Sequence, residues 1–187
     1  DGVQPIKLNK VIQMFRTVLV SSLSVLALAA GASAQEGQIR LGAGYEAADF
    51  DGVDFDTVVV RGSYDFTRYL GVEGQLNIGL GDESLTVGGL TGDVSLDYVA
   101  GVFGVVRPWS NEDGSVFLRA GYTTTEAEAS AAGLNFSASD EAWAYGVGGE
   151  YFFDARNGIR ADYTRYDYDD GGDADFFGVS YVRRIGG

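Results

Sequence analysis

Hydrophobic and polar residues alternate with a period of two along most of this chain, which is typical of half-buried β-strands. The alternation is clearest after Tyr69, where Val72, Leu76 and Ile78 would face one side of a strand while Glu73 faces the other. Stretches rich in Gly, Asp, Asn or Ser interrupt it repeatedly, and these residues favour turns. The pattern therefore predicts an all-β chain of strands joined by turns and loops.

Eight alternating segments are predicted, and the connections between them alternate in length. The segments are residues 38–46, 57–66, 70–80, 94–107, 116–123, 143–153, 159–164 and 177–185. Short connections at 67–69, 108–114 and 154–157 alternate with longer ones at 47–56, 81–93, 126–140 and 167–175. An even number of strands with long loops at one rim only is typical of a closed membrane barrel, whereas a soluble sandwich does not require this regularity.

The sizes of the two side-chain series indicate which face points into such a barrel. Eight strands enclose a space just wide enough to be filled by side chains. The aliphatic and aromatic series is too bulky for that space, whereas the opposite series is rich in Gly, Ser and Thr with a few ionic groups. We therefore predict an eight-stranded antiparallel up-and-down transmembrane β-barrel whose apolar face contacts lipid. A soluble lipocalin-like barrel, with its apolar face inside, is the alternative.

Aromatic residues near the strand ends are predicted to form two girdles at the membrane interfaces. Near the short turns these residues are Tyr64, Phe66, Tyr69, Trp109, Tyr151 and Phe153. Near the long loops they are Tyr45, Phe55, Tyr122, Trp143, Tyr166 and Tyr168. Arg165 departs from the pattern. Its parity, that is, its odd or even position in the strand, places a charge on the lipid face together with Ile159, Ala161 and Tyr163. We therefore expect a β-bulge or a change of phase before Tyr166.

The first 34 residues are predicted to be absent from the mature protein. Met14 begins a short positive segment, residues 18–30 are apolar, and small residues precede the boundary between Ala34 and Gln35. These are the features of a Sec signal peptide, and the apolar segment is too short to span a bilayer comfortably. We predict a cleavable helical signal peptide at 14–34 and the barrel at 35–187, with residues 1–13 as an over-extended or non-native start. An uncleaved membrane anchor is the alternative.

Composition excludes several kinds of chemistry. The chain has no cysteine and no histidine, so disulfides, thiolate or histidine metal sites and histidine-based catalysis are impossible. Without residues 1–34 the chain holds 10 arginines, no lysine and 26 acidic residues, and this negative balance disfavours nucleic-acid binding. No nucleophile–base pair stands out, so we predict no enzyme activity, no cofactor and no metal site.

Charged residues on the small-residue series are predicted to pair inside the barrel. Unpaired charges in a narrow lumen would be costly, whereas paired and hydrogen-bonded ones are tolerable. We expect a structural salt-bridge network centred on Glu73, Arg119, Glu150 and Arg160. The full set is Arg40, Arg61, Glu73, Arg119, Glu150, Arg160 and Asp162. The alternative is that these charges face trapped water without specific pairing.

The chain resembles the family of small outer-membrane barrels that includes OmpA-type and OmpX-type domains. The resemblance covers residues 35–187, and its most specific parts are residues 158–163 and the closing strand 177–185. It implies a bacterial outer-membrane location and recognition of the closing strand by the barrel-assembly machinery. The closing strand departs from the family pattern, because Ile185 stands where a terminal Phe is usual and Arg183 where an aromatic is usual. No peptidoglycan-binding domain of the OmpA kind is expected after the last strand.

Acidic residues concentrate in the predicted long loops. They are Asp49, Asp51, Asp54, Asp56, Asp82, Glu83, Asp93, Glu126, Glu128, Asp140, Glu141, Asp167, Asp169, Asp170, Asp173 and Asp175. Arginines 68, 107, 156, 183 and 184 are expected at the opposite rim. The acidic surface could bridge lipopolysaccharide phosphates through divalent cations, since carboxylates suit hard cations. The alternative is a set of solvated loops that repel one another.

Two functions from different classes remain open. The first is a structural or surface-interaction barrel, monomeric and with a lumen filled by side chains. The second is a narrow porin-like channel for water or small solutes, although a lumen crossed by Arg, Glu and aromatic side chains argues against a wide pore. An outer-membrane enzyme acting on lipid A or peptides is disfavoured because histidine is missing.

Overall fold

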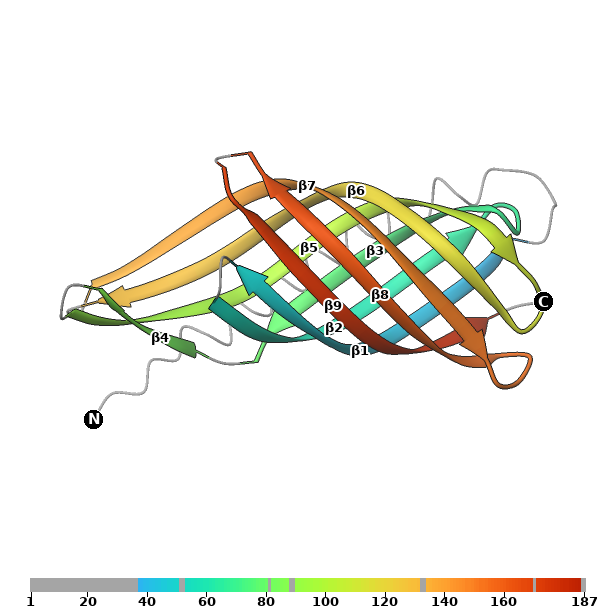
Figure 1. Ribbon diagram of the computed structural model, residues 1–187, viewed down its shortest axis with the longest axis horizontal. Helices are drawn as coiled ribbons and strands as arrows, with labels where there is room; N and C mark the ends of the chain where they lie inside the picture. The colour runs from blue at the N-terminus through green and yellow to red at the C-terminus, as the bar shows by residue number, and fades with distance from the viewer. Residues whose placement is uncertain are drawn as a thin grey trace. The chain divides into compact units, whose positions relative to one another are not determined.

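The computed structural model describes residues 37–50, 53–80, 82–87, 90–131, 134–169 and 171–185. These residues form one antiparallel β-sheet that closes on itself (Figure 1). The described part contains no helix long and apolar enough to cross a membrane. The predicted segments 1–13 and 14–34, and the predicted cleavage site between Ala34 and Gln35, lie outside the described residues.

Within the described residues, nine strands make up the sheet, and eight of them close the barrel. Their bounds are β1 Gln38–Phe50, β2 Val53–Asp65, β3 Leu70–Gly79, β4 Asp82–Val87, β5 Leu90–Ser110, β6 Gly114–Ala131, β7 Leu134–Phe152, β8 Asn157–Tyr168 and β9 Asp173–Ile185. Each barrel strand pairs with its neighbour in the chain, β3 pairs with β5, and β1 pairs with β9. The prediction of a closed eight-stranded antiparallel barrel is confirmed, with β4 as an additional strand outside the ring.

Three short connections define one end of the barrel, which we call the turn end. They lie between β2 and β3, between β5 and β6, and between β7 and β8, and each is closed by backbone hydrogen bonds such as Phe66 N–H to the Leu70 carbonyl. In the last turn the Asp154 carboxylate accepts hydrogen bonds from the backbone N–H groups of Arg156 and Asn157 and from the Asn157 amide. These donors lower the pKa of Asp154, so the turn is held by an ionised cap.

The opposite end, which we call the hairpin end, extends further than the sequence predicted. Residues 81–93 and 126–140 were expected to be loops, but β4 pairs with the start of β5, and β6 pairs with β7 as far as Ala131 and Leu134. In Figure 1 these extensions project beyond the tips of β1, β2, β8 and β9. The prediction failed because it relied on apolar–polar alternation, and a ladder of backbone hydrogen bonds needs no apolar face.

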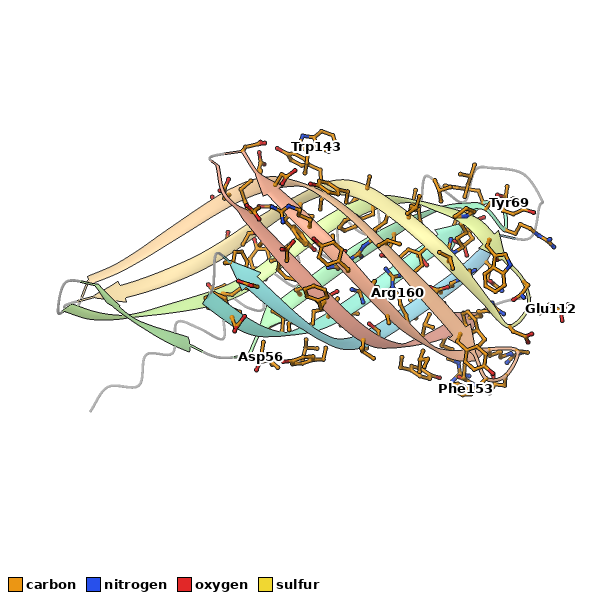
Figure 2. All side chains as sticks on the ribbon, in the orientation of Figure 1. Asp56, Tyr69, Glu112, Trp143, Phe153 and Arg160 are labelled. Atoms are coloured by element: carbon orange, nitrogen blue, oxygen red, sulfur yellow. The ribbon has the colours of Figure 1, made fainter. Side chains whose placement is uncertain are left out.

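The outer surface of the barrel carries the apolar series. Leu41, Val102, Leu118 and Val179 expose about half or more of their side chains, and Trp143 at the hairpin end and Phe153 at the turn end also point outward (Figure 2). The next residue along each strand is usually buried inside. The barrel thus exposes its apolar series on the outside and buries its charged side chains inside, which is the inverted arrangement of a membrane barrel.

Two irregularities in the pairing of β5 and β6 change the predicted phase. The first lies between Leu96 and Tyr98, and the second between Val106 and Trp109. Leu96 belongs by its parity to the aliphatic series of residues 94–107, which was predicted to contact lipid, but the first irregularity places it inside with 5% exposure. A β-bulge inserts one unpaired residue, so it moves the following side chains to the other face.

Arg165 shows no bulge of the kind that was expected before Tyr166. The pairing of β8 is regular with both of its neighbours through this region. Arg165 stays on the outer face near the hairpin end, where its guanidinium forms ion pairs with Asp167, Asp173 and Asp175. The expected change of phase is therefore wrong, and nearby carboxylates compensate the charge.

Candidate functional site: the lumen

The lumen holds ten buried charged side chains, five of each sign, among the residues that the structure describes. They are Arg40, Glu46, Arg61, Asp65, Glu73, Arg107, Arg119, Glu150, Arg160 and Asp162. None of them exposes more than 7% of its surface. They come from seven of the eight barrel strands, so the network joins almost the whole circumference. Figure 2 shows Arg160 about midway along the barrel.

Ion pairs link these charges in alternating order, beginning near the hairpin end. The Arg61 guanidinium pairs with Glu46 and lies 3.2 Å from an oxygen of Asp162. The same carboxylate oxygen lies 3.0 Å from Arg119, whose other terminal nitrogen lies 3.0 Å from Glu73. Each charge in this part of the lumen therefore touches two or more groups of opposite sign, apart from Glu46 at its end.

The alternation continues from Glu73 to the turn end. Arg160 lies 2.5 Å from the second oxygen of Glu73 and 3.9 Å from Glu150, which pairs in turn with Arg40. Asp65 completes the series, with one oxygen 2.8 Å from Arg40 and the other 2.5 Å from Arg107. The ten charges thus form one connected series along the inside of the barrel.

Neutral polar side chains satisfy much of what the ion pairs leave open. Gln75 accepts a hydrogen bond from Arg61 at 3.0 Å, and Thr164 accepts one from Arg119 at 2.9 Å. Asn77 donates to Glu46 and to Thr57. Buried charges are tolerable only when their remaining donors and acceptors are paired in this way.

Aromatic rings pack against the arginines of this network. The guanidinium of Arg119 lies 4.6 Å from the ring centre of Phe103, and that of Arg160 lies 4.2 Å from that of Phe117. Gly148 makes room for the second ring, because a Cβ there would lie 2.4 Å from the tip of Phe117. Cation–π contacts of this kind add attraction and exclude water from the charges.

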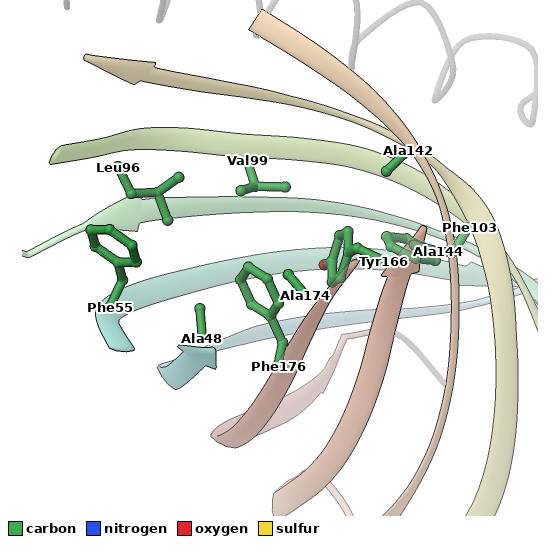
Figure 3. Packing of buried hydrophobic residues seen from close by; sticks show 10 residues of the cluster. All are labelled: Ala48, Phe55, Leu96, Val99, Phe103, Ala142, Ala144, Tyr166, Ala174 and Phe176. Atoms are coloured by element: carbon green, nitrogen blue, oxygen red, sulfur yellow. The ribbon is translucent and has the colours of Figure 1, made fainter. Parts of the chain in front are cut away.

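The half of the lumen near the hairpin end is filled mainly by apolar side chains. This apolar cluster consists of Ala48, Phe55, Leu96, Val99, Phe103, Ala142, Ala144, Tyr166, Ala174 and Phe176 (Figure 3). The rings of Tyr166 and Phe176 lie 4.5 Å apart, and Phe50 and Tyr168 pack against the cluster. The interior is therefore richer in bulky apolar groups than the expected filling of Gly, Ser, Thr and ionic groups.

Three aromatic residues that were assigned to the outer girdle lie on the inside. Tyr166 is fully buried, Phe55 is 8% exposed, and Tyr168 is half-buried against the apolar cluster. The prediction was wrong because it gave more weight to the position of these residues near a strand end than to their parity along the strand. Tyr166 shares its parity with Thr164 and Asp162, both of which face the lumen.

The structure places all seven residues of the predicted network in the lumen and in contact with partners of opposite charge. It also adds three charges that the prediction omitted, Glu46, Asp65 and Arg107. The first two have the same parity as their inward neighbours Arg40 and Arg61, so the alternation alone could have identified them. Arg107 was expected at the rim, but it is completely buried next to the second pairing irregularity.

A collar of tyrosines faces outward at the hairpin end, and carboxylates accept their hydroxyl hydrogen bonds. Tyr45 donates to Asp56, and Tyr163 donates to Asp175 at 2.7 Å. Tyr122 is near both Glu141 and Asp169, at 3.1 and 3.0 Å. This rim is therefore polar and negative directly above the apolar band. Among the described residues, no group of three or more acidic side chains is arranged to hold a metal ion.

Comparison with known protein families identifies this architecture. The profile of the outer membrane protein beta-barrel domain matches residues 18–184. The chain belongs to this family. This protein is therefore an outer-membrane barrel of that family, and its lumen contains the network of ion pairs described above. A comparison with curated proteins gives no match.

Solved structures of outer-membrane barrels share this fold at low sequence identity. Ail of Yersinia pestis, in complex with the heparin analogue sucrose octasulfate, is 23% identical, with 81% of this chain and 100% of that chain covered and a TM-score of 0.60. OprG from Pseudomonas aeruginosa is 10% identical, with 81% and 97% covered and a TM-score of 0.56. Neisserial surface protein A is 12% identical, with 83% and 100% covered and a TM-score of 0.53.

Proposed function

We propose that this protein is a structural and surface-interaction barrel of the bacterial outer membrane, with a lumen that does not conduct. The observation that carries the proposal is the filling of the lumen. The connected ion pairs occupy its middle and turn end, and the apolar cluster occupies the hairpin end. A solute would have to break buried ion pairs and also cross an apolar constriction.

Solute flux into proteoliposomes tests this proposal. The refolded barrel is reconstituted into liposomes, and swelling is followed after addition of glycine, an amino acid smaller than any sugar. We expect the rate to equal that of protein-free liposomes, while an open porin in a parallel sample gives rapid swelling. Swelling that increases with the amount of this barrel would favour the alternative function, a narrow porin-like channel for water or small solutes.

The surface role rests on the hairpin end. Carboxylates such as Asp56, Asp169 and Asp175 accompany the outward tyrosines at the level where lipid head groups begin. Divalent cations would let these carboxylates bridge to lipopolysaccharide phosphates. We expect lipopolysaccharide binding that requires Mg²⁺ or Ca²⁺ and is abolished by a chelator; binding that persists in chelator would contradict the bridging role.

The ligand seen with Ail is not expected to bind here. Sucrose octasulfate is a polyanion, and it is bound by that protein. At the hairpin end of the present barrel Arg165 is already surrounded by Asp167, Asp173 and Asp175. Like charges repel a polyanion, so this rim fits cations or cation-bridged partners better than sulfated sugars.

Export and assembly complete the proposal. We expect a Sec signal peptide cleaved between Ala34 and Gln35, and insertion as a monomer by the barrel-assembly machinery. N-terminal sequencing of the protein from isolated outer membranes would give Gln35 as the first residue. Heat-modifiable migration on a gel would show the folded barrel in that fraction, whereas recovery in the soluble periplasm would contradict the location.

A further inference from the structure

The turn end of the lumen contains arginine donors that no group in the described structure satisfies. Arg107 is completely buried, and only one of its terminal nitrogens has a partner, Asp65. Its Nε and its other terminal nitrogen, Nη2, are buried without a hydrogen-bond partner. The Nε of Arg184 is buried and unpartnered in the same way. Leaving buried donors unpaired is costly, so these nitrogens are expected to bind an acceptor, either an ordered water molecule or an anion.

These donors belong to one cluster at the mouth of the lumen. Arg184 is the register partner of Arg40 on the neighbouring strand, and Arg40 shares Asp65 with Arg107. Arg184 also reaches the opposite side of the mouth, where its Nη1 donates to the backbone carbonyl of Glu112 at 2.9 Å. The cluster therefore draws together residues from β1, β2, β5 and β9.

The charges of this cluster do not cancel. The ten fully buried charges of the lumen balance five against five, and Arg184 adds one positive charge. The ring of Phe152 lies 3.4 Å from the Arg184 guanidinium and 5.7 Å from that of Arg40, so an apolar group, not a carboxylate, separates these two cations. A water molecule could accept the free hydrogen bonds, but only an anion would also neutralise the excess charge.

The free donors of Arg107 select the kind of anion. Its Nε–H and the adjacent N–H of Nη2 lie on the same side of the planar guanidinium, which is the fork that binds two oxygens of a carboxylate or phosphate. The remaining terminal nitrogen, Nη1, already donates to Asp65. We propose that Arg107 and Arg184 form a binding site for one small oxyanion, a carboxylate or phosphate group, at the turn end of the lumen.

Calorimetric titration tests the site in maltoside detergent, where no lipid phosphate is present. Inorganic phosphate and acetate are the probes, chloride is the comparison, and ionic strength is held constant. We expect saturable binding of phosphate or acetate at one site per barrel, and none of chloride. Absence of saturable binding by both oxyanions would overturn the proposal.

Three variants assign any binding to the site. Arg107→Lys keeps the charge next to Asp65 but removes the fork, so affinity should fall about tenfold or more. Arg184→Gln should weaken binding without the loss of a fully buried ion pair, and it keeps the test informative if the first variant does not fold. Arg156→Lys, at an exposed turn position, is the control and should bind as the unmodified barrel does. Unchanged affinity in both lumen variants would contradict the assignment.

Discussion

The two halves of the lumen are filled by different kinds of side chain. From the middle to the turn end, charges of alternating sign are joined by ion pairs, with Glu73 between Arg119 and Arg160. Towards the hairpin end, rings such as Tyr166 and Phe176 pack against small and aliphatic side chains. The ionic half depends on every partner being present, whereas the apolar half depends on volume. The two halves should therefore respond differently to substitution.

The largest effect is expected in the ionic half. Glu73→Gln removes the charge that faces Arg119 and Arg160 and leaves both without one of their partners. Breaking a buried ion pair from one side costs about 3–5 kcal/mol, so unfolding of the variant in lipid vesicles should need far less denaturant. Glu112→Gln, at an exposed turn position, should leave the unfolding midpoint unchanged. Equal midpoints for Glu73→Gln and the unmodified barrel would show that water solvates the ionic half.

A smaller effect is expected in the apolar half. Phe176→Ala opens a cavity among Phe50, Tyr166 and their neighbours, and removal of a buried ring costs about 3 kcal/mol. Phe177 is a matched control, because it is adjacent in the chain but 60% exposed on the outer surface. Phe177→Ala leaves no cavity in the lumen and should destabilise less. The same loss at both positions in denaturant unfolding would mean that the apolar cluster is loosely packed.

The smallest effect on stability is expected for a residue on the outer surface of the barrel. Arg165 contacts three carboxylates, as many as the buried Arg160 does, but about a third of its side chain is exposed. Exposed ion pairs contribute about 0–1 kcal/mol and are screened by salt. Arg165→Gln should therefore shift the unfolding midpoint slightly, and the shift should vanish at high salt. A loss as large as that of Glu73→Gln would mean that burial does not determine the strength of these pairs.

The sequence predicted the barrel well because its two faces differ strongly in polarity. Parity alone placed Arg40, Arg61 and Glu150 inside, where the structure has them. It failed where the backbone departs from regular pairing, as at Leu96, since a bulge leaves no mark in the alternation. Arg107 follows the inward parity of Phe103 and Val105, and it was misplaced because its closeness to the turn was given more weight. The individual ion pairs could not be predicted, because they depend on which strands face each other across the lumen and at what height.

The hairpin end was the least predictable region. Tyr166 was assigned to the girdle because aromatic residues at strand ends are common on the outer face of membrane barrels. The fully buried position of Tyr166 shows that an aromatic on the inward parity can instead fill the lumen. Parity is therefore a better guide than distance from the strand end when the two disagree.

Ion conductance in planar lipid bilayers tests the closed lumen most directly. The purified, refolded barrel is added in potassium chloride under an applied voltage, and current is recorded from single insertions. Because both the ion-pair network and the apolar cluster fill the lumen, we expect the unmodified barrel to give a current no higher than that of the bare bilayer. A variant that combines Glu73→Gln with Tyr166→Ala and Phe176→Ala should leak, because both halves are then opened. Discrete, reproducible conductance steps from the unmodified barrel would contradict the closed lumen.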